Sequence, residues 1–351
     1  MEGEAEETKF IPREDLQALL SDEGRFRLYP FFPYDESRRF EMLSIEMEPG
    51  SRSESVPHEE GTEEYVLVFE GTMKLTVDGN KYLIHAGECI RYNASKAHIS
   101  CERARIWTES FKRTEGLPQQ IRTAQAFYDA CHELPVTIFE GELVVGASGE
   151  FRRCGILTPE YGWKWVDDEM DDFATRPQDP YDMTDEQREF CRKEIFPCWA
   201  GKSVEDTFLA RASEETKKIG VDTGFLDTDS KWRGGIGEIS PDYVDQLFPK
   251  GFGGIKKEAM AYMEGLSETD PADMKKRDFY KSILLVCDGI IALANRYSQK
   301  AKEMAAEEGD AVRKAELEEI AAVCAAVPEN PPKSFREAIQ FAWFVEPDGT
   351  A

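Results

Sequence analysis

The stretch PHEEGTEEYVLVFEGTMKLTVDG, residues 57–79, decides the fold of the N-terminal part of the chain. Apolar and polar residues alternate approximately over Tyr65–Phe69 and again over Met73–Val77, and this period of two is typical of strands with one buried face. Gly71 separates the two runs, and an Asp-Gly pair at 78–79 follows the second. Asp-Gly after alternating apolar residues is a strong signal for a two-residue hairpin. The stretch therefore predicts short antiparallel strands.

Outside this stretch, the same period of two continues in both directions. Phe40–Met47 alternates upstream, Lys81–His85 alternates downstream, and a Pro-Gly pair at 49–50 marks a turn. Several short strands separated by turns predict an all-β barrel or sandwich.

From about residue 100 the period changes to that of amphipathic helices. Apolar residues recur at helical spacing in four segments, which are Arg103–Thr114, Gln119–Glu133, Met274–Glu308 and Ala311–Ala326. The change near residue 99 comes without a Gly-, Ser- or Pro-rich linker, which is unusual between two independently folding domains.

The composition limits the possible partners. The chain has 351 residues, with 43 Lys and Arg against 69 Asp and Glu, and its net charge is −26. Phosphate backbones and anionic membrane surfaces would repel such a chain, so no direct nucleic-acid or membrane partner is expected. Hydrophobic residues make up 41% of the chain, which argues against a disordered acidic protein.

The sequence shows no signal for export. No apolar run approaches the roughly 18 residues of a membrane span, and the acidic start MEGEAEETK differs from a signal peptide. The eight cysteines form no CxxC pair and suit reduced thiols. We therefore expect a cytoplasmic protein.

Three residues of the β segment are candidate metal ligands: His58, Glu64 and His98. Imidazole and carboxylate groups together suit a divalent transition metal, and distant strands can bring such side chains into one mouth of a barrel.

The spacing of these residues resembles that of the cupin family. The positions that correspond to the two family motifs include Gly50, His58, Glu64, Gly71 and His98. The resemblance covers about residues 25–98, with the ligand-sensing cupins of bacterial transcription regulators as its best likeness. It implies a β jelly-roll barrel with a pocket for a metal or a small ligand.

Two departures weaken the metal site that this resemblance implies. Val56 stands where the family has its first metal His, and the second motif lacks its Pro, Gly and Asn. The site can therefore have at most three protein ligands for a divalent transition metal. The alternative is a pocket that holds an organic ligand or nothing. The helix-turn-helix of the regulators is not expected, because too few residues precede the barrel.

Four blocks stand out from residue 101 onward. They are CERARIWTESFKRTEGLPQQIRTAQAF (101–127), EGELVVGA (140–147), DDFATRPQDPYDMT (171–184) and IFPCWAGKSVEDTF (195–208). Taken singly, they predict a helix, a strand, and turns built on prolines. Together and in this order they resemble the N-terminal part of glycyl radical enzymes, in the branch of choline lyase and of the diol and hydroxyproline dehydratases.

The resemblance runs over about residues 100–345 and implies a mainly helical α/β segment that begins a ten-stranded barrel. Enzymes of this family carry a thiyl radical on a Cys of a central loop and store the radical on a Gly near the C-terminus. Neither motif is found in this chain, whose cysteines in other contexts include Cys154, Cys191, Cys198 and Cys287. The chain thus offers no catalytic residue and no support for a glycyl radical cofactor, and we expect it to be inactive alone.

One block retains candidate substrate contacts. In the family, the stretch DTDSKWRGGIGEISPDYVDQLFPKGFGGI (227–255) leads into the active site, so the resemblance implies substrate binding by Trp232, Arg233 and Glu238. Dehydratases of this branch often have a His where this chain has Glu238. The alternative is that the glycines only allow close backbone packing and that Glu238 is solvated.

These observations predict a multidomain chain. Residues 1–99 are expected to form a cupin-like β jelly-roll barrel without its last strands, and residues 100–351 a truncated glycyl radical enzyme segment. The implied function is that of a radical lyase or dehydratase for a small polar molecule, with a second chain supplying the rest. The alternatives are a cupin sensor module joined to a scaffold, and a chimeric fragment without joint function. Open strand edges and apolar helix faces predict self-association.

Overall fold

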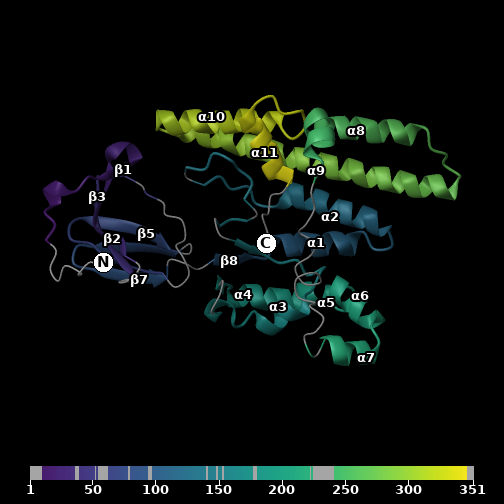
Figure 1. Ribbon diagram of the computed structural model, residues 1–351, viewed down its shortest axis with the longest axis horizontal. Coiled ribbons are helices and arrows are strands. Elements are labelled where there is room, and N and C mark those ends of the chain that lie inside the picture. Colours follow the sequence, from purple (N-terminus) through teal and green to yellow (C-terminus); the bar gives the residue numbers. More distant parts are fainter. Residues whose placement is uncertain are drawn as a thin grey trace, which may run out of the picture. The chain divides into compact units, whose positions relative to one another are not determined.

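The computed structural model (Figure 1) describes residues 10–35, 39–51, 53, 62–77, 80–93, 97–139, 141–147, 149–151, 154–176, 180–221, 223 and 241–345. By its internal contacts the chain divides into two compact units, residues 1–56 and residues 57–351.

The first unit contains a three-stranded antiparallel sheet in the order β1-β2-β3. β3 has the bounds that the alternating pattern predicts, and its Ile45 pairs with Leu28 of β2. The ladder between β2 and β3 shifts register in the segment that contains Pro30 and Pro33, because proline has no N–H to donate to a neighbouring strand. The elements are η1 (Arg13–Asp15), β1 (Leu19–Ser21), η2 (Asp22–Gly24), β2 (Phe26–Asp35) and β3 (Phe40–Met47).

The second unit begins with two strand pairs. β4 (Glu63–Leu67) runs antiparallel to β7 (Cys89–Asn93), and β5 (Thr72–Val77) runs antiparallel to β6 (Asn80–His85). Val77 pairs with Asn80, so two residues connect β5 to β6, as the Asp-Gly signal predicts. The predicted strands are therefore confirmed. The pairs form separate two-stranded sheets, and the described strands do not close into a barrel.

A small parallel sheet follows, and its central strand comes from the end of the cupin-like stretch. β8 (Ala97–Ser100) lies between β9 (Cys154–Ile156) and β10 (Tyr181–Asp182). Parallel neighbours require long crossover connections, which the helices between these strands provide. β8 therefore joins the segment that follows it directly, which explains why the sequence has no linker near residue 99. The two compact units meet at residues 56/57, whereas the domain boundary predicted from the sequence lies at 99/100.

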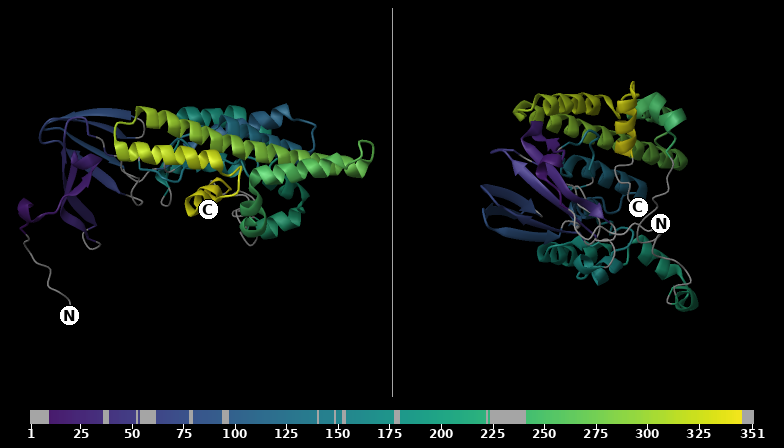
Figure 2. Two further views of the ribbon diagram at one scale, coloured as in Figure 1. Left: turned by 90° about the horizontal axis from the view of Figure 1, so that it is seen from above. Right: turned by 60° about the vertical axis from the view of Figure 1, so that its left-hand side comes forward.

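The helices predicted from their apolar period are all present. Gln119–Glu133 (α2) and Ala311–Ala326 (α10) have the predicted bounds, and Glu102–Arg113 (α1) and Pro271–Glu307 (α9) differ from prediction only near their ends. Figures 1 and 2 show α10 running back along α9, while α2 packs on α9 from another side. No helix of the described ranges is long and apolar enough to cross a membrane.

Two apolar cores hold the helices together. One core gathers around α9, α10 and α11 and includes Tyr297, Leu317 and Phe341, each at most 1% exposed. The other gathers around α1 and the short helices and includes Trp107 and Phe196. The remaining elements are α3 (Lys164–Glu169), η3 (Phe173–Thr175), α4 (Asp185–Phe190), η4 (Cys191–Ile195), α5 (Phe196–Trp199), α6 (Val204–Arg211), α7 (Glu214–Thr216), η5 (Lys217–Val221), η7 (Tyr243–Leu247), α8 (Phe248–Glu264) and α11 (Phe335–Val345).

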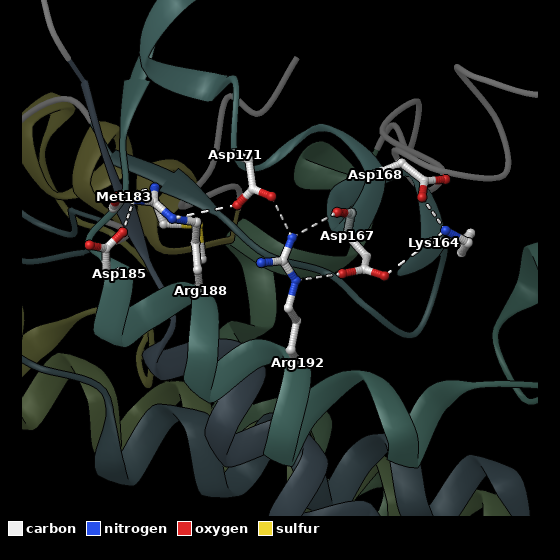
Figure 3. A network of polar contacts seen from close by, with 8 residues as sticks. All are labelled: Lys164, Asp167, Asp168, Asp171, Met183, Asp185, Arg188 and Arg192. Carbon is white, nitrogen blue, oxygen red and sulfur yellow. Dashed lines mark hydrogen bonds and ion pairs between the residues drawn. The ribbon is translucent and has the colours of Figure 1, made fainter.

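An exposed network of ion pairs connects α3 to the continuous helical run of α4 and η4 (Figure 3). Arg192 lies at its centre, with Nε 3.0 Å from Asp167 Oδ1 and Nη2 2.8 Å from Asp171 Oδ2. Lys164 pairs with Asp168 at one end, and Arg188 pairs with Asp185 at the other. The contacts of Arg192 tie segments that are more than twenty residues apart in sequence.

The strand predicted over residues 140–147 is wrong for the described residues 141–147, which have no strand partner. A side chain replaces the missing strand. The N–H of Val145 donates to Oε1 of Gln340 at 2.9 Å, and Nε2 of Gln340 donates to the carbonyl of Val145 at 2.7 Å. The β-like composition of this block therefore reflects burial, since Val145 is 0% exposed.

Candidate functional site

Glu64 lies on the half-buried face of β4, which it shares with Val66, whereas Tyr65 and Leu67 lie on the exposed face. Directly opposite in the ladder is Tyr92 of β7, whose hydroxyl donates to Oε2 of Glu64. Burial, together with this hydrogen bond, raises the pKa of Tyr92 far above its ordinary value. The carboxylate of Glu64 is thus fixed by a hydrogen bond on the half-buried face of the β4–β7 pair.

Tyr92, the partner of Glu64, is not among the candidate residues predicted from the sequence. The two residues face each other because β4 pairs with β7 in antiparallel register. Each strand is visible in the sequence, but the register between them is not, since 21 residues separate Leu67 from Cys89. A correct prediction of this register would have identified Tyr92.

His98 lies in β8, the central strand of the parallel sheet, between the buried residues Ala97 and Ile99. Its imidazole stacks on Phe151 with 4.1 Å between ring centroids. Cys154 of β9 and Asp182 of β10 pair with it across the two ladders. The strand that carries this candidate ligand is therefore well anchored, by elements that follow the cupin-like stretch.

The third candidate ligand, His58, lies outside the described residues. In the described part of the chain, no three His, Cys, Asp or Glu side chains gather closely enough to hold a metal ion. Because His58 is not among those residues, this finding does not bear on the predicted trio.

The candidate substrate contacts Trp232, Arg233 and Glu238 also lie outside the described residues. The end of their block is described, and there the close-packing interpretation applies. Gly251 has φ of 61°, and a Cβ at this position would lie 2.4 Å from the carbonyl oxygen of Glu329. The N–H of Gly253 donates to that same oxygen at 2.9 Å. At these two positions glycine is required because another backbone passes directly against the chain.

Several cysteines of the helical part are core residues. Burial raises the pKa of Cys131 and Cys324 to about 12 and that of Cys287 to about 11. Cys101 and Cys191 lie with their sulfurs 3.7 Å apart in the core around α1. The hydrogen bond between these two thiols and their burial raise the pKa of Cys101. Thiols whose pKa is raised in this way are poor nucleophiles at neutral pH.

Comparisons with known proteins give relatives for both segments. The family model "Pyruvate formate lyase-like" matches residues 85–347, and the model "Cupin domain" matches residues 43–100. The cupin match agrees with a 46% identity over 68 residues to the HTH-type transcriptional regulator SutR of Escherichia coli, covering 19% of this chain and 38% of that protein.

The relatives of the longer segment are glycyl radical enzymes, among them lyases and dehydratases. The isethionate sulfite-lyase of Oleidesulfovibrio alaskensis is 36% identical over 263 residues, which cover 73% of this chain and 32% of that protein. The glycerol dehydratase of Clostridium butyricum matches in structure with a TM-score of 0.67 and 36% identity, over 72% of this chain and 32% of that one.

The chain thus spans about a third of the length of the curated lyases and dehydratases that it matches. Since the family model covers well over half of the chain, and both its sequence and its helical architecture agree with solved members, the chain belongs to the pyruvate formate lyase-like family and carries a cupin domain ahead of that segment.

Proposed function

We propose that the chain supplies the N-terminal part of a glycyl radical lyase or dehydratase that acts on a small polar molecule. The observation that carries the proposal is the match of residues 85–347, in sequence and in structure, to enzymes of this kind. Isethionate and glycerol, named for two of the relatives, are both small and polar. Trp232, Arg233 and Glu238 are the proposed substrate contacts. We also propose a cytoplasmic location, which the eight free cysteines support.

The 351-residue polypeptide is proposed to be inactive by itself. Abstraction of hydrogen from an unactivated carbon needs a radical, and the chain has no recognisable Cys loop or Gly loop to carry one. The burial and raised pKa values of Cys131, Cys287 and Cys324 support a structural role for these thiols. A second chain with the two loops is the proposed partner that would complete the enzyme.

Electron paramagnetic resonance tests this proposal. The purified chain is incubated anaerobically with a glycyl radical activating enzyme and S-adenosylmethionine, with a complete family member as the positive control. We expect the doublet of a glycyl radical in the control and no signal from the chain. A doublet from the chain alone would contradict the proposal.

We further propose that the cupin domain forms a jelly-roll with a three-ligand site for a divalent transition metal at His58, Glu64 and His98. The donor types suit such a metal, and Glu64 lies on the half-buried face of its strand with Tyr92 holding one oxygen. Three protein ligands and water can hold a divalent ion. Because Val56 stands where the family has a further imidazole ligand, we expect weak binding.

Metal analysis of purified proteins tests the site. The His58→Ala variant should lose the metal, while His85→Ala serves as the matched control, because His85 lies in the same domain and bonds Thr72 instead. Occupancy of the wild type should fall as the pH drops through about 6.5, since a protonated imidazole cannot bind a metal. Equal metal content in the wild type and the His58→Ala variant would exclude the site.

A further inference from the structure

The strand β3 forms one edge of the three-stranded sheet in the first unit, and its outer side has no strand partner among the described residues. The opposite edge is β1, which has three residues, whereas β3 has eight residues and no proline. Long edge strands without proline are ready to pair with a further strand, because their outward N–H and C=O groups form a free row of donors and acceptors. We call the outer side of residues 40–47 the β3 edge.

The ladder with β2 shows which backbone groups point to the β3 edge. The N–H of Glu48 donates to the carbonyl of Arg25 at 2.9 Å, and the register continues from this pair without a shift as far as Leu43 opposite Pro30. Bonded and non-bonded pairs alternate along an antiparallel ladder, so the even-numbered residues in this part of β3 bond β2. The odd-numbered residues, among them Ile45, therefore point their N–H and C=O groups to the β3 edge.

The same odd-numbered residues carry an apolar face of the sheet. Side chains alternate between the two faces of a strand, so Leu43, Ile45 and Met47 lie on one face, and the register places Leu28 of β2 beside Ile45. Leu43 is 38% exposed, Ile45 50% and Met47 40%. A strand added at the β3 edge would bring its own side chains against these three and remove apolar area from water.

The carboxylates of β3 and of the residue after it are largely compensated within the sheet. Glu46 pairs with Arg13, and Oε1 of Glu48 lies 2.6 Å from Nη2 of Arg27. The remaining charge of the chain, which is −26 in total, acts at longer range and is screened by salt. A second copy can therefore approach this edge without bringing unpaired carboxylates together.

The sequence of β3 is complementary to itself in antiparallel orientation. Because the odd-numbered residues supply the free backbone groups in both copies, an edge pair must set odd positions opposite odd positions. With a two-fold axis at Ser44, Leu43 of one copy lies opposite Ile45 of the other, and Glu41 lies opposite Met47. This register gives two Leu–Ile pairs and sets no carboxylate opposite another, whereas a shift by two positions loses both Leu–Ile pairs.

We propose that two copies of this chain form a closed dimer by antiparallel pairing of their β3 edges across a two-fold axis at Ser44. The joined sheet runs from β1 of one copy to β1 of the other. Its ends are three-residue strands, which offer little for a further copy to pair with, so this route of association stops at the dimer. The interface is independent of the radical chemistry and of the metal ligands.

Disulfide cross-linking of the full 351-residue chain tests the register. In the proposed pair, Ser44 lies opposite Ser44 of the second copy at a non-bonded position, where the two Cα atoms are about 4.5 Å apart, a distance that a disulfide can span. The variant is Ser44→Cys in a Cys89→Ser background, which removes the exposed native thiol. With oxidised glutathione as the oxidant, it should give a covalent dimer on a denaturing gel without reductant.

Ser21→Cys in the same background is the matched control. It makes the same substitution at an exposed position of the other edge strand, β1. At micromolar protein, Ser44→Cys should give at least about tenfold more covalent dimer than Ser21→Cys, because pairing holds the two thiols at a high effective concentration. Equal yields from the two variants would overturn the proposal.

Ile45→Pro and Ile45→Ala, each added to the Ser44→Cys chain, separate backbone pairing from side-chain contact. Proline removes the outward N–H without touching the bonds to β2, so the covalent dimer should fall to the level of Ser21→Cys. Alanine keeps the N–H and should retain most of the covalent dimer. Circular dichroism checks that each variant folds.

Two results would contradict the β3 pairing. One is a folded Ile45→Pro variant that cross-links as well as its parent, since the backbone bonds would then have no part in the contact. The other is a Ser44→Cys chain that stays monomeric under oxidation, which would leave the β3 edge to a different chain. The comparison of Ser44→Cys with Ser21→Cys decides the proposal even if Ile45→Pro does not fold.

Discussion

The side-chain amide of Gln340 makes the two backbone hydrogen bonds with Val145 that a neighbouring strand would otherwise make. It is 1% exposed and closes two hydrogen bonds with the backbone of Val145, which lies 195 residues earlier in the chain. An irregular segment buried without a strand partner needs such a group, because its N–H and C=O cannot reach water. Gln340 therefore connects the last described helix, α11, to the loop that follows α2.

Replacing Gln340 by Met keeps the volume and removes both hydrogen bonds. The N–H and C=O of Val145 would stay buried without partners, so we expect a loss of roughly 2–4 kcal/mol in the free energy of unfolding. Urea unfolding of the wild type and the variant, followed by far-UV circular dichroism, measures it.

The matched control is Gln299→Met on the exposed face of α9, where the described partner of Gln299 is Glu303, one turn away. This change should stay within about 0.5 kcal/mol of the wild type. If the two variants unfold at the same urea concentration, the two hydrogen bonds of Gln340 do not contribute the expected free energy of unfolding.

Ion pairs connect α3 and the turn after it to α4 and η4, in addition to the apolar core that Val166 of α3 shares with Cys191 and Ile195 of η4. Arg192 reaches both Asp167 and Asp171, and Arg188 approaches Asp171 at 3.7 Å (Figure 3). The hydrogen bond from Arg192 holds the pKa of Asp171 below its ordinary value. A carboxyl with a lowered folded-state pKa adds stability above its unfolded-state pKa, and this stability is lost as the pH falls through the folded-state value.

We therefore expect Arg192→Gln to lower the thermal unfolding midpoint at pH 7 and to matter less as the pH falls below the ordinary pKa of an aspartate, about 3.9, toward the lowered folded-state pKa of Asp171. Differential scanning fluorimetry over this pH range measures the difference from the wild type. Lys193→Gln is the control with the same change in net charge, since among the described residues Lys193 pairs with Glu189 on its own helical run. A difference between wild type and Arg192→Gln that stays constant with pH would contradict the assigned cause.

The α11 helix shows how one element can face two environments. Gln340, Phe341 and Phe344 are buried, whereas Phe335 is 81% exposed and Trp343 is 43% exposed. Phe335, Ile339 and Trp343 follow one another at intervals of four residues and so share one side of the helix. This α11 stripe, formed by Phe335, Ile339 and Trp343, leaves apolar area in contact with water.

At the scale of the whole molecule, exposed apolar side chains predict self-association. They occur in both units: Leu20, Met42 and Ile45 in the first, and Phe69, Leu83 and the α11 stripe in the second. Such patches, together with unpaired strand edges, promote contacts between copies. We expect assemblies larger than a monomer by light scattering at tens of micromolar protein.

A double variant tests whether the α11 stripe contributes to this association. Changing Phe335 and Ile339 to Gln makes most of the stripe polar without touching the buried residues, so the mean assembly size should fall. Val312→Gln is the control, because it also replaces an exposed apolar residue by Gln, on α10 and outside the stripe. A clean monomer from the wild-type chain would contradict the prediction for the whole molecule.

The amino-acid sequence by itself determined the elements whose signals are local. The apolar period predicted Gln119–Glu133 and Ala311–Ala326 with their observed bounds, and the Asp-Gly pair predicted the connection between Val77 and Asn80. These signals work because helical and hairpin geometry depends on residues a few positions apart. The motifs were likewise enough to identify both families, since each motif is a set of residue types at close spacing.

Only the tertiary structure decided which distant segments meet. It placed β8 between β9 and β10, set Tyr92 opposite Glu64, and brought Gln340 into hydrogen bonds with the backbone of Val145. Each of these contacts joins residues dozens of positions apart, and no local period encodes such a pairing. It follows from how the helices and strands bury their apolar faces together, and this is why the register and the second hydrogen-bond partner had to come from the folded chain.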